Sequence, residues 1–177
     1  MAKLLLITGP SGAGKTTVSK SLLKQLTGEW AYISQDDLRQ LVIAGYASAD
    51  DYEHEWSEEV RRQWNVSIPI CVDVAKRYLD VGINCIIDFY APPNEFEKWK
   101  KELKDIPYTL IVLRPDLGST LERNRSREER AKLKDNKIRQ NYKAFEEWSQ
   151  TEIRVVDTSK EKVSVTVEAI EKIISLI

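Results

Sequence analysis

Short apolar runs and longer amphipathic stretches alternate along this chain. Five apolar runs have the length and composition of strands, and they cover Lys3–Thr8, Trp30–Ser34, Ile83–Asp88, Tyr108–Leu113 and Ile153–Val156. The stretches between them place apolar residues at helical spacing. Such alternation is typical of a parallel sheet wrapped by helices. The pattern therefore predicts an α/β fold of three layers, with five parallel strands and helices on both faces.

The longest helical pattern contains a proline. Its apolar face is formed by Val60, Trp64, Ile68, Cys71, Ala75 and Leu79. Pro69 lies inside it, and we expect a kink or break there because proline lacks a backbone donor. Shorter helices are expected at Thr17–Leu26, Leu38–Ala44, Glu95–Leu103, Leu117–Arg127 and Asn136–Trp148. A last helix carries Val163, Val167, Ile170 and Ile174 on one face.

The first strand leads into a phosphate-binding motif. Residues Gly9-Pro10-Ser11-Gly12-Ala13-Gly14-Lys15-Thr16 match G-x-x-x-x-G-K-[ST] between a strand and a helix. Glycines let the chain curl so that backbone N–H groups point at phosphate oxygens, and the helix dipole adds to this. Lys15 is placed to reach the β- and γ-phosphates, and the Thr16 hydroxyl to ligate Mg²⁺. The sequence therefore predicts a nucleoside triphosphate site formed by Gly9, Ser11, Gly12, Ala13, Gly14, Lys15, Thr16 and Thr17.

Acidic residues follow the second and third strands. Ligands of such sheets bind beyond the carboxyl ends of the strands, so a carboxylate there can take the proton of an attacking hydroxyl. We assign this role to Asp36 and the capping of the next helix to Asp37. Asp88 ends the third strand. It either holds Mg²⁺ through water, contacts the acceptor, or hydrogen-bonds a turn.

A basic stretch follows the fourth strand, over residues 122–139, and its first part, about 122–135, is the expected lid. The cations of the stretch are Arg123, Arg125, Arg127, Arg130, Lys132, Lys134, Lys137 and Arg139. This composition predicts an arginine-rich lid that folds over the triphosphate, with Arg127 as the catalytic arginine and Arg123 as a second phosphate contact. The alternative is a solvated helix face with internal ion pairs. Thr158, after the fifth strand, is expected near the base of the nucleotide or in a helix cap.

An insert of about residues 37–65 is expected over the acceptor. It is rich in acids, namely Asp37, Asp50, Asp51, Glu53, Glu55, Glu58 and Glu59. That charge favours a neutral or cationic acceptor over a phosphorylated one. Tyr46, Tyr52, Trp56 and Trp64 could stack on a sugar, a base or a cation. The alternatives are solvated acids and buried tryptophans.

Length and composition predict a single domain spanning 1–177. The chain is 42% hydrophobic and 31% charged, with a net charge of −1, so it offers no general field for nucleic acid. No apolar run approaches the length of a membrane span, and we expect no membrane partner and no signal peptide. Cys71 and Cys85 lack metal-ligand spacing and suit a reducing cytoplasm as buried residues.

Three segments together resemble one group of P-loop proteins, and this resemblance covers essentially the whole chain. The Gly9–Thr17 loop, the Gln35–Arg39 segment and the Arg123–Arg130 stretch are similar to those of nucleoside-monophosphate-kinase-like proteins. Within that group the chain looks like gluconate-kinase-like and chloramphenicol-phosphotransferase-like proteins and AAA-type kinases. The resemblance implies ATP and Mg²⁺ as cofactors and transfer to a hydroxyl of a small metabolite or antibiotic. It also implies that Arg123 stacks near adenine.

Two other functions stay open. Asp36 and Arg39 have the spacing of polynucleotide 5′-hydroxyl kinases, although the acidic insert departs from the basic groove that phosphates require. The third function is a P-loop NTPase that serves as a switch or binding module. Leu113-Arg114-Pro115-Asp116 lacks the guanine-reading motif of such switches. For a kinase, the acceptor-binding residues expected are Asp36, Arg39, Trp56 and Asp88.

Overall fold

The fold was analysed in a computed structural model, which describes residues 1–48, 56–127, 132–150, 154–159 and 162–176. Within these residues five strands form one parallel sheet in the order β2-β3-β1-β4-β5. The strands are β1 (Leu4–Thr8), β2 (Trp30–Ser34), β3 (Asn84–Asp88), β4 (Thr109–Leu113) and β5 (Arg154–Val156). The predicted α/β fold and its parallel sheet are confirmed. Ile153, the first residue of the fifth predicted strand, lies outside the described residues.

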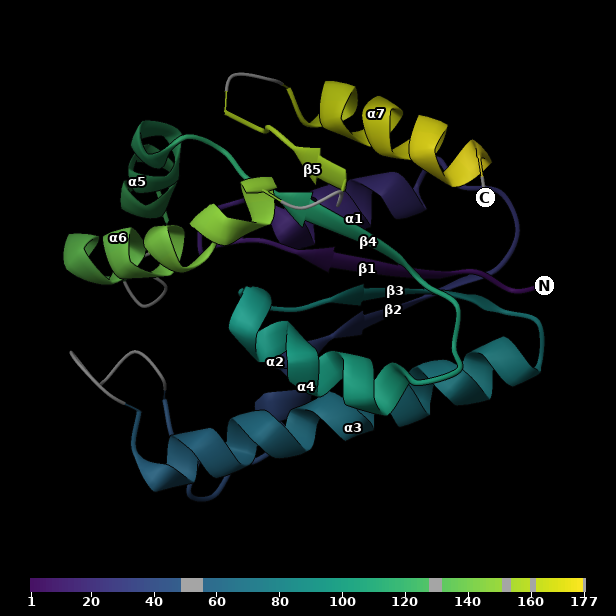
Figure 1. Cartoon of the computed structure of the whole chain (residues 1–177), viewed down its shortest axis with the longest axis horizontal. Coiled ribbons are helices and arrows are strands. Elements are labelled where there is room, and N and C mark those ends of the chain that lie inside the picture. Colours follow the sequence, from purple (N-terminus) through teal and green to yellow (C-terminus); the bar gives the residue numbers. More distant parts are fainter. Residues whose placement is uncertain (49–55, 128–131, 151–153, 160–161, 177) are drawn as a thin grey trace.

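Helices cover both faces of this sheet (Figure 1). They are α1 (Lys15–Leu23), α2 (Gln35–Arg39), α3 (Glu58–Asp80), α4 (Pro93–Leu103), α5 (Leu117–Arg125), α6 (Asp135–Ala144) and α7 (Val163–Ser175), with a short 3-10 helix, η3 (Glu146–Gln150). Helices α1 and α7 lie on one face, and α3 and α4 lie on the other. The chain thus has three layers, as the alternating pattern predicts.

Alternate residues of β1 point into two separate cores because side chains of a strand alternate between faces. Leu4 and Leu6 pack with α3 and α4, whereas Leu5 and Ile7 pack with α1 and α7. The first core contains Cys71 and Cys85, and burial raises the pKa of Cys71 to about 12 and of Cys85 to about 11. Both cysteines are therefore buried small residues, as expected.

Pro69 does not break α3. The helix runs without interruption from Glu58 to Asp80, so the break that the sequence analysis allows for is wrong. The apolar face around the proline is buried, with Ile68 2% exposed and Cys71 fully covered. Packing of this face against the sheet offsets the loss of one backbone hydrogen bond.

Helix α2 begins earlier than its hydrophobic pattern predicts, at Gln35 rather than Leu38. Ser34 is its N-cap, and the Ser34 hydroxyl accepts a hydrogen bond from the backbone N–H of Asp37 at 3.2 Å. The expected capping role of the Asp37 side chain is therefore wrong. A serine at the end of a strand can start the helix directly, without an intervening acid.

Candidate active site

The phosphate loop joins β1 to α1 and lies against the end of β4. A Cβ atom on Gly9 would come within 2.3 Å of the carbonyl oxygen of Leu113, so this position accepts only glycine. Gly14 has φ of 90° and caps α1, which begins at Lys15. The loop thus ends on the first turn of a helix, where free backbone N–H groups favour an anion.

Lys15 lies at the centre of the site. Its ammonium group donates to the carbonyl oxygens of Gly9 at 3.1 Å and Pro10 at 3.4 Å. Burial lowers the pKa of Lys15, while the charges of Asp88 and Asp36 act in the opposite direction. Lys15 is therefore held over its own loop between two carboxylates.

Asp88 is 5% exposed, and its Oδ2 atom accepts two hydrogen bonds. The Thr16 hydroxyl donates at 2.7 Å and the Tyr32 hydroxyl at 2.9 Å. Burial raises the pKa of Asp88, against the effects of Lys15 and of these hydrogen bonds. The end of β3 and the start of α1 thus meet at one carboxylate.

Thr16 and Asp88 together provide an oxygen donor set that fits Mg²⁺. Mg²⁺ in phosphoryl-transfer sites takes one or two protein oxygens and completes its shell with phosphates and water. A hydroxyl and a carboxylate 2.7 Å apart at the mouth of the loop match that requirement. Among the described residues, no group of three His, Cys, Asp or Glu side chains could hold a metal by itself, so an ion here would depend on the nucleotide.

Asp36 and Arg39 face each other across the first turn of α2. The Asp36 carboxylate is 67% exposed and lies 3.8 Å from the Arg39 guanidinium. Arg39 is 4% exposed and lies over the ring of Trp64, with 4.3 Å between Cζ and the ring centroid. Its position is fixed further by the Tyr46 ring at 5.5 Å and the Ala47 carbonyl. The Asp36 carboxylate is thus accessible to a ligand, whereas the Arg39 side chain is buried and held by its neighbours.

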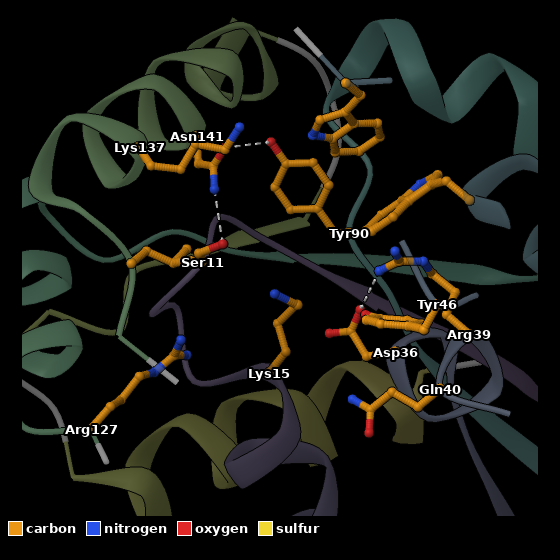
Figure 2. A pocket seen from close by; sticks show the side chains of 13 residues that line it. Ser11, Lys15, Asp36, Arg39, Gln40, Tyr46, Tyr90, Arg127, Lys137 and Asn141 are labelled. Atoms are coloured by element: carbon orange, nitrogen blue, oxygen red, sulfur yellow. Dashed lines mark hydrogen bonds and ion pairs between the residues drawn. The ribbon is translucent and has the colours of Figure 1, made fainter. Parts of the chain in front are cut away.

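A cavity of about 340 Å³ joins these groups, and we refer to it as the main cavity. Figure 2 shows Ser11 and Arg127 on one side, Asp36, Arg39 and Tyr46 on the other, and Lys15 between the two groups. Its lining residues are Ser11, Lys15, Asp36, Arg39, Gln40, Tyr46, Trp56, Trp64, Tyr90, Arg127, Leu133, Lys137 and Asn141. The predicted catalytic residues Lys15, Asp36 and Arg127 therefore meet in one space. Of the predicted acceptor residues, Arg39 and Trp56 line it, whereas Asp88 is buried below Thr16.

A second cavity, of about 140 Å³, lies beside the other end of the phosphate loop. It is lined by Ala13, Gly14, Thr17, Val18, Arg123, Thr158, Val163 and Thr166. Arg123 donates to the hydroxyl and the carbonyl of Thr158, and the Thr158 hydroxyl donates to the Ala13 carbonyl at 3.2 Å. The hydrogen bonds of Thr158 thus link the last strand to the loop.

The basic stretch divides into residues with different surroundings. Arg125 pairs with Asp135 at 2.6 Å on the surface, whereas Arg127 is exposed at the rim of the main cavity. Arg130 lies outside the described residues, as do the acids Asp50, Asp51, Glu53 and Glu55 and the aromatic Tyr52 of the insert. The lid and the acidic insert therefore stay predictions, and the predicted helix over 136–148 is divided between α6 and η3.

Sequence patterns did not identify three residues that the structure brings to the site. The Tyr90 hydroxyl donates to Asn141 at 3.3 Å, and the Asn141 amide donates to the Ser11 hydroxyl at 3.0 Å (Figure 2). Lys137, one helical turn before Asn141, lines the same cavity. Tyr90 follows β3 by two residues, which is the one local signal that pointed to this edge of the sheet.

The comparisons with known proteins agree with this geometry. The family model described as an AAA domain matches residues 4–150. The chain belongs to this AAA-domain family. No curated protein matches the sequence significantly. The family match covers β1 to η3 and so includes the phosphate loop, Asp36 and Asn141.

Solved structures of low sequence identity share the fold of this AAA-domain protein. A sugar kinase from Janibacter sp. HTCC2649 superimposes with a TM-score of 0.69 at 14% identity, over 97% of this chain and 94% of the other. The tunicamycin resistance protein of Deinococcus radiodurans gives 0.70 at 18% identity, over 98% and 96%. Shikimate kinase from Acinetobacter baumannii, in complex with shikimate, gives 0.66 at 15% identity, over 98% and 93%. The recognition of a P-loop kinase fold is confirmed.

The described part of the chain has no helix with the length and apolar character needed to span a bilayer.

Proposed function

We propose that this AAA-domain protein is an ATP-dependent kinase that transfers the γ-phosphate to a hydroxyl of a small molecule. The observation that carries the proposal is the shared cavity of Lys15 and Asp36. The Lys15 ammonium, on the phosphate loop, and the exposed Asp36 carboxylate, on α2, line the same space. Phosphoryl transfer requires this pairing of a phosphate clamp with a group that orients or deprotonates the acceptor.

Nucleotide binding is assigned to the loop and its two cavities. ATP would place its phosphates on the loop N–H groups, and Lys15 would exchange the carbonyls of Gly9 and Pro10 for β- and γ-phosphate oxygens. The adenine is assigned to the cavity between Arg123 and Thr17, on the far side of Gly14. Mg²⁺, held by Thr16 and by Asp88 through water, would neutralise charge on the phosphates.

Asp36 is assigned as the base. Its side chain is mostly in solvent and lies 3.8 Å from the Arg39 guanidinium, so it is placed to accept the proton of a bound hydroxyl. Arg127, at the rim, is assigned to the charge that develops on the transferred group. The aromatic rings of Tyr46 and Trp56 would exclude water from the acceptor.

Polynucleotide 5′-hydroxyl kinase is the second candidate, and one observation favours it. Among the described charged residues that line the main cavity, four are basic (Lys15, Arg39, Arg127 and Lys137) and one is acidic, Asp36. A basic surface of this kind tolerates phosphodiesters. Labelling of 5′-hydroxyl oligonucleotides at low and high salt tests this candidate, because phosphate contacts make transfer steeply salt-dependent.

Transfer from γ-labelled ATP to a panel of hydroxyl compounds tests the proposal. The panel includes sugars and polyols, aminoglycosides and 5′-hydroxyl oligonucleotides. Lys15→Ala should abolish transfer, because the charge-assisted phosphate contact is lost. Lys24→Ala, at the exposed end of α1, is the matched control and should retain activity. Equal transfer by the Lys15 variant would contradict the proposal, and ATP hydrolysis without any transfer would favour an NTPase module.

A further inference from the structure

Another cavity adjoins the main cavity on the side away from the phosphate loop. It has a volume of about 430 Å³, and we refer to it as the distal cavity. The two cavities share four lining residues: Trp56, Tyr90, Lys137 and Asn141. Cavities with that much common lining are adjacent. A ligand in the main cavity therefore lies next to the distal cavity, with these side chains between them.

Lys137 lies at the junction, without a partner among the residues that the structure describes. It is half-buried, and no hydrogen bond or ion pair joins its ammonium group to any residue that the structure describes. Ile138, fully buried beside it, fixes the orientation of α6. Asn141 lies one turn later on the same face and is held by Ser11 and Tyr90. Helix α6 thus places the Lys137 ammonium group at the boundary of both cavities, and the burial of Ile138 fixes that position.

Two ion pairs lie near the junction among the described residues. Asp36 faces Arg39 in the main cavity at 3.8 Å. Lys98 pairs with Glu95 at 2.6 Å in the distal cavity. The distal cavity contains one more described cation, Arg61, whose Nε atom donates to the carbonyl of Trp56 at 3.0 Å. The net charge of the described residues that line the junction is therefore positive, and it attracts an anion.

We infer that the acceptor carries an anionic group, a phosphate or a carboxylate, in addition to the hydroxyl that reacts. Lys137 binds this group at the junction, while the hydroxyl lies beside Asp36. Trp56 and Tyr90, shared by both cavities, flank the part of the acceptor that connects them. This inference rests on the proposed kinase function and names its substrate class. It reverses the preference for neutral or cationic acceptors that the acidic insert suggests.

Binding of matched probes tests the inference without knowledge of the natural acceptor. The probes are thymidine 3′-monophosphate against thymidine, gluconate against glucose, and a 5′-hydroxyl decathymidylate. Tryptophan fluorescence reports binding because Trp56 and Trp64 line the main cavity. A saturating non-hydrolysable ATP analogue with Mg²⁺ keeps the probes off the phosphate loop. The protein, its Lys137→Gln variant and its Lys143→Gln variant are titrated in parallel. Lys143 is the control because it is an exposed lysine on the same helix.

The anionic member of at least one pair should bind about tenfold more tightly than its neutral partner, which is the scale of one charge-assisted contact. Lys137→Gln should remove this difference, and Lys143→Gln should retain it. The kind of anion is read from which probe shows the effect. The nucleotide pair tests a phosphate monoester, the gluconate pair tests a carboxylate, and the decathymidylate tests a phosphodiester. Equal binding within both pairs would overturn the inference. So would weaker binding of the ATP analogue to the Lys137 variant, because Lys137 would then serve the nucleotide.

Failure of the inference can be separated from failure of the kinase proposal. Transfer to neutral hydroxyl compounds, with no preference for anions, would support the kinase proposal and contradict the inferred anion site. Anion binding that depends on Lys137, with no transfer to any hydroxyl, would support the anion site and contradict the kinase proposal.

Discussion

Asp36→Asn should separate catalysis from folding. The substitution keeps the size of the side chain and removes its charge. Asp36 is 67% exposed and its contact with Arg39 is 3.8 Å long, so the lost ion pair should cost no more than about 1 kcal/mol of stability. Arg39 retains its packing on Trp64 and its hydrogen bond to Ala47. Loss of a general base, in contrast, lowers the rate by roughly 10²–10⁴-fold, which corresponds to about 3–5 kcal/mol in the barrier.

The assay compares single-turnover transfer from γ-labelled ATP with the affinity for a fluorescent ATP analogue. Transfer by Asp36→Asn should fall while nucleotide affinity and urea denaturation stay close to those of the unmodified protein. Asp37→Asn is the matched control, because Asp37 is an exposed neighbour whose backbone N–H is capped by Ser34. A larger loss in the Asp37 variant, or a parallel loss of nucleotide affinity at Asp36, would refute the assignment of the base.

Two further substitutions test the metal site and the core. Asp88→Asn should raise the Mg²⁺ concentration for half-maximal transfer, because the carboxylate that holds Thr16 loses its charge. Removal of a supporting carboxylate usually costs roughly tenfold or more in metal affinity. An unchanged Mg²⁺ titration would contradict this prediction. Trp99→Ala should lower the free energy of unfolding by about 3–5 kcal/mol in urea denaturation, since Trp99 is fully buried against Phe89 at 4.2 Å. Trp30→Ala, at a half-buried position, should cost clearly less, and equal losses would disprove the reasoning.

Local patterns predicted the strands well, because each strand is a short apolar run with its own boundaries. The second strand, Trp30–Ser34, has the predicted limits. The phosphate loop was predictable for a similar reason, since its geometry depends on glycines that lie close together in one short segment of the sequence. Ser34 was missed as a cap because it also ends a strand, and nothing in a hydrophobic pattern marks a residue with both roles.

The junction residues were not predictable from the sequence. Tyr90 contacts Asn141 from 51 positions away, and Asn141 contacts Ser11 from 130 positions away. No local pattern encodes such contacts, which follow from the strand order and the packing of α6. Lys137 illustrates the same limit, because the sequence shows it only as one cation within a basic stretch. Its position between two cavities, with no ion pair to any described residue, is a property of the folded chain.

The strand order also determines when the site can form. The phosphate loop follows β1, but β1 pairs with β3 and β4 rather than with β2. Gly9 can reach its close contact with Leu113 only after the strand that carries Leu113, far along the chain from Gly9, has been made. Pairings of such long range slow folding, because loop closure must precede the contacts that reward it. The nucleotide-binding motif is therefore local in sequence, but its final surroundings depend on a distant strand.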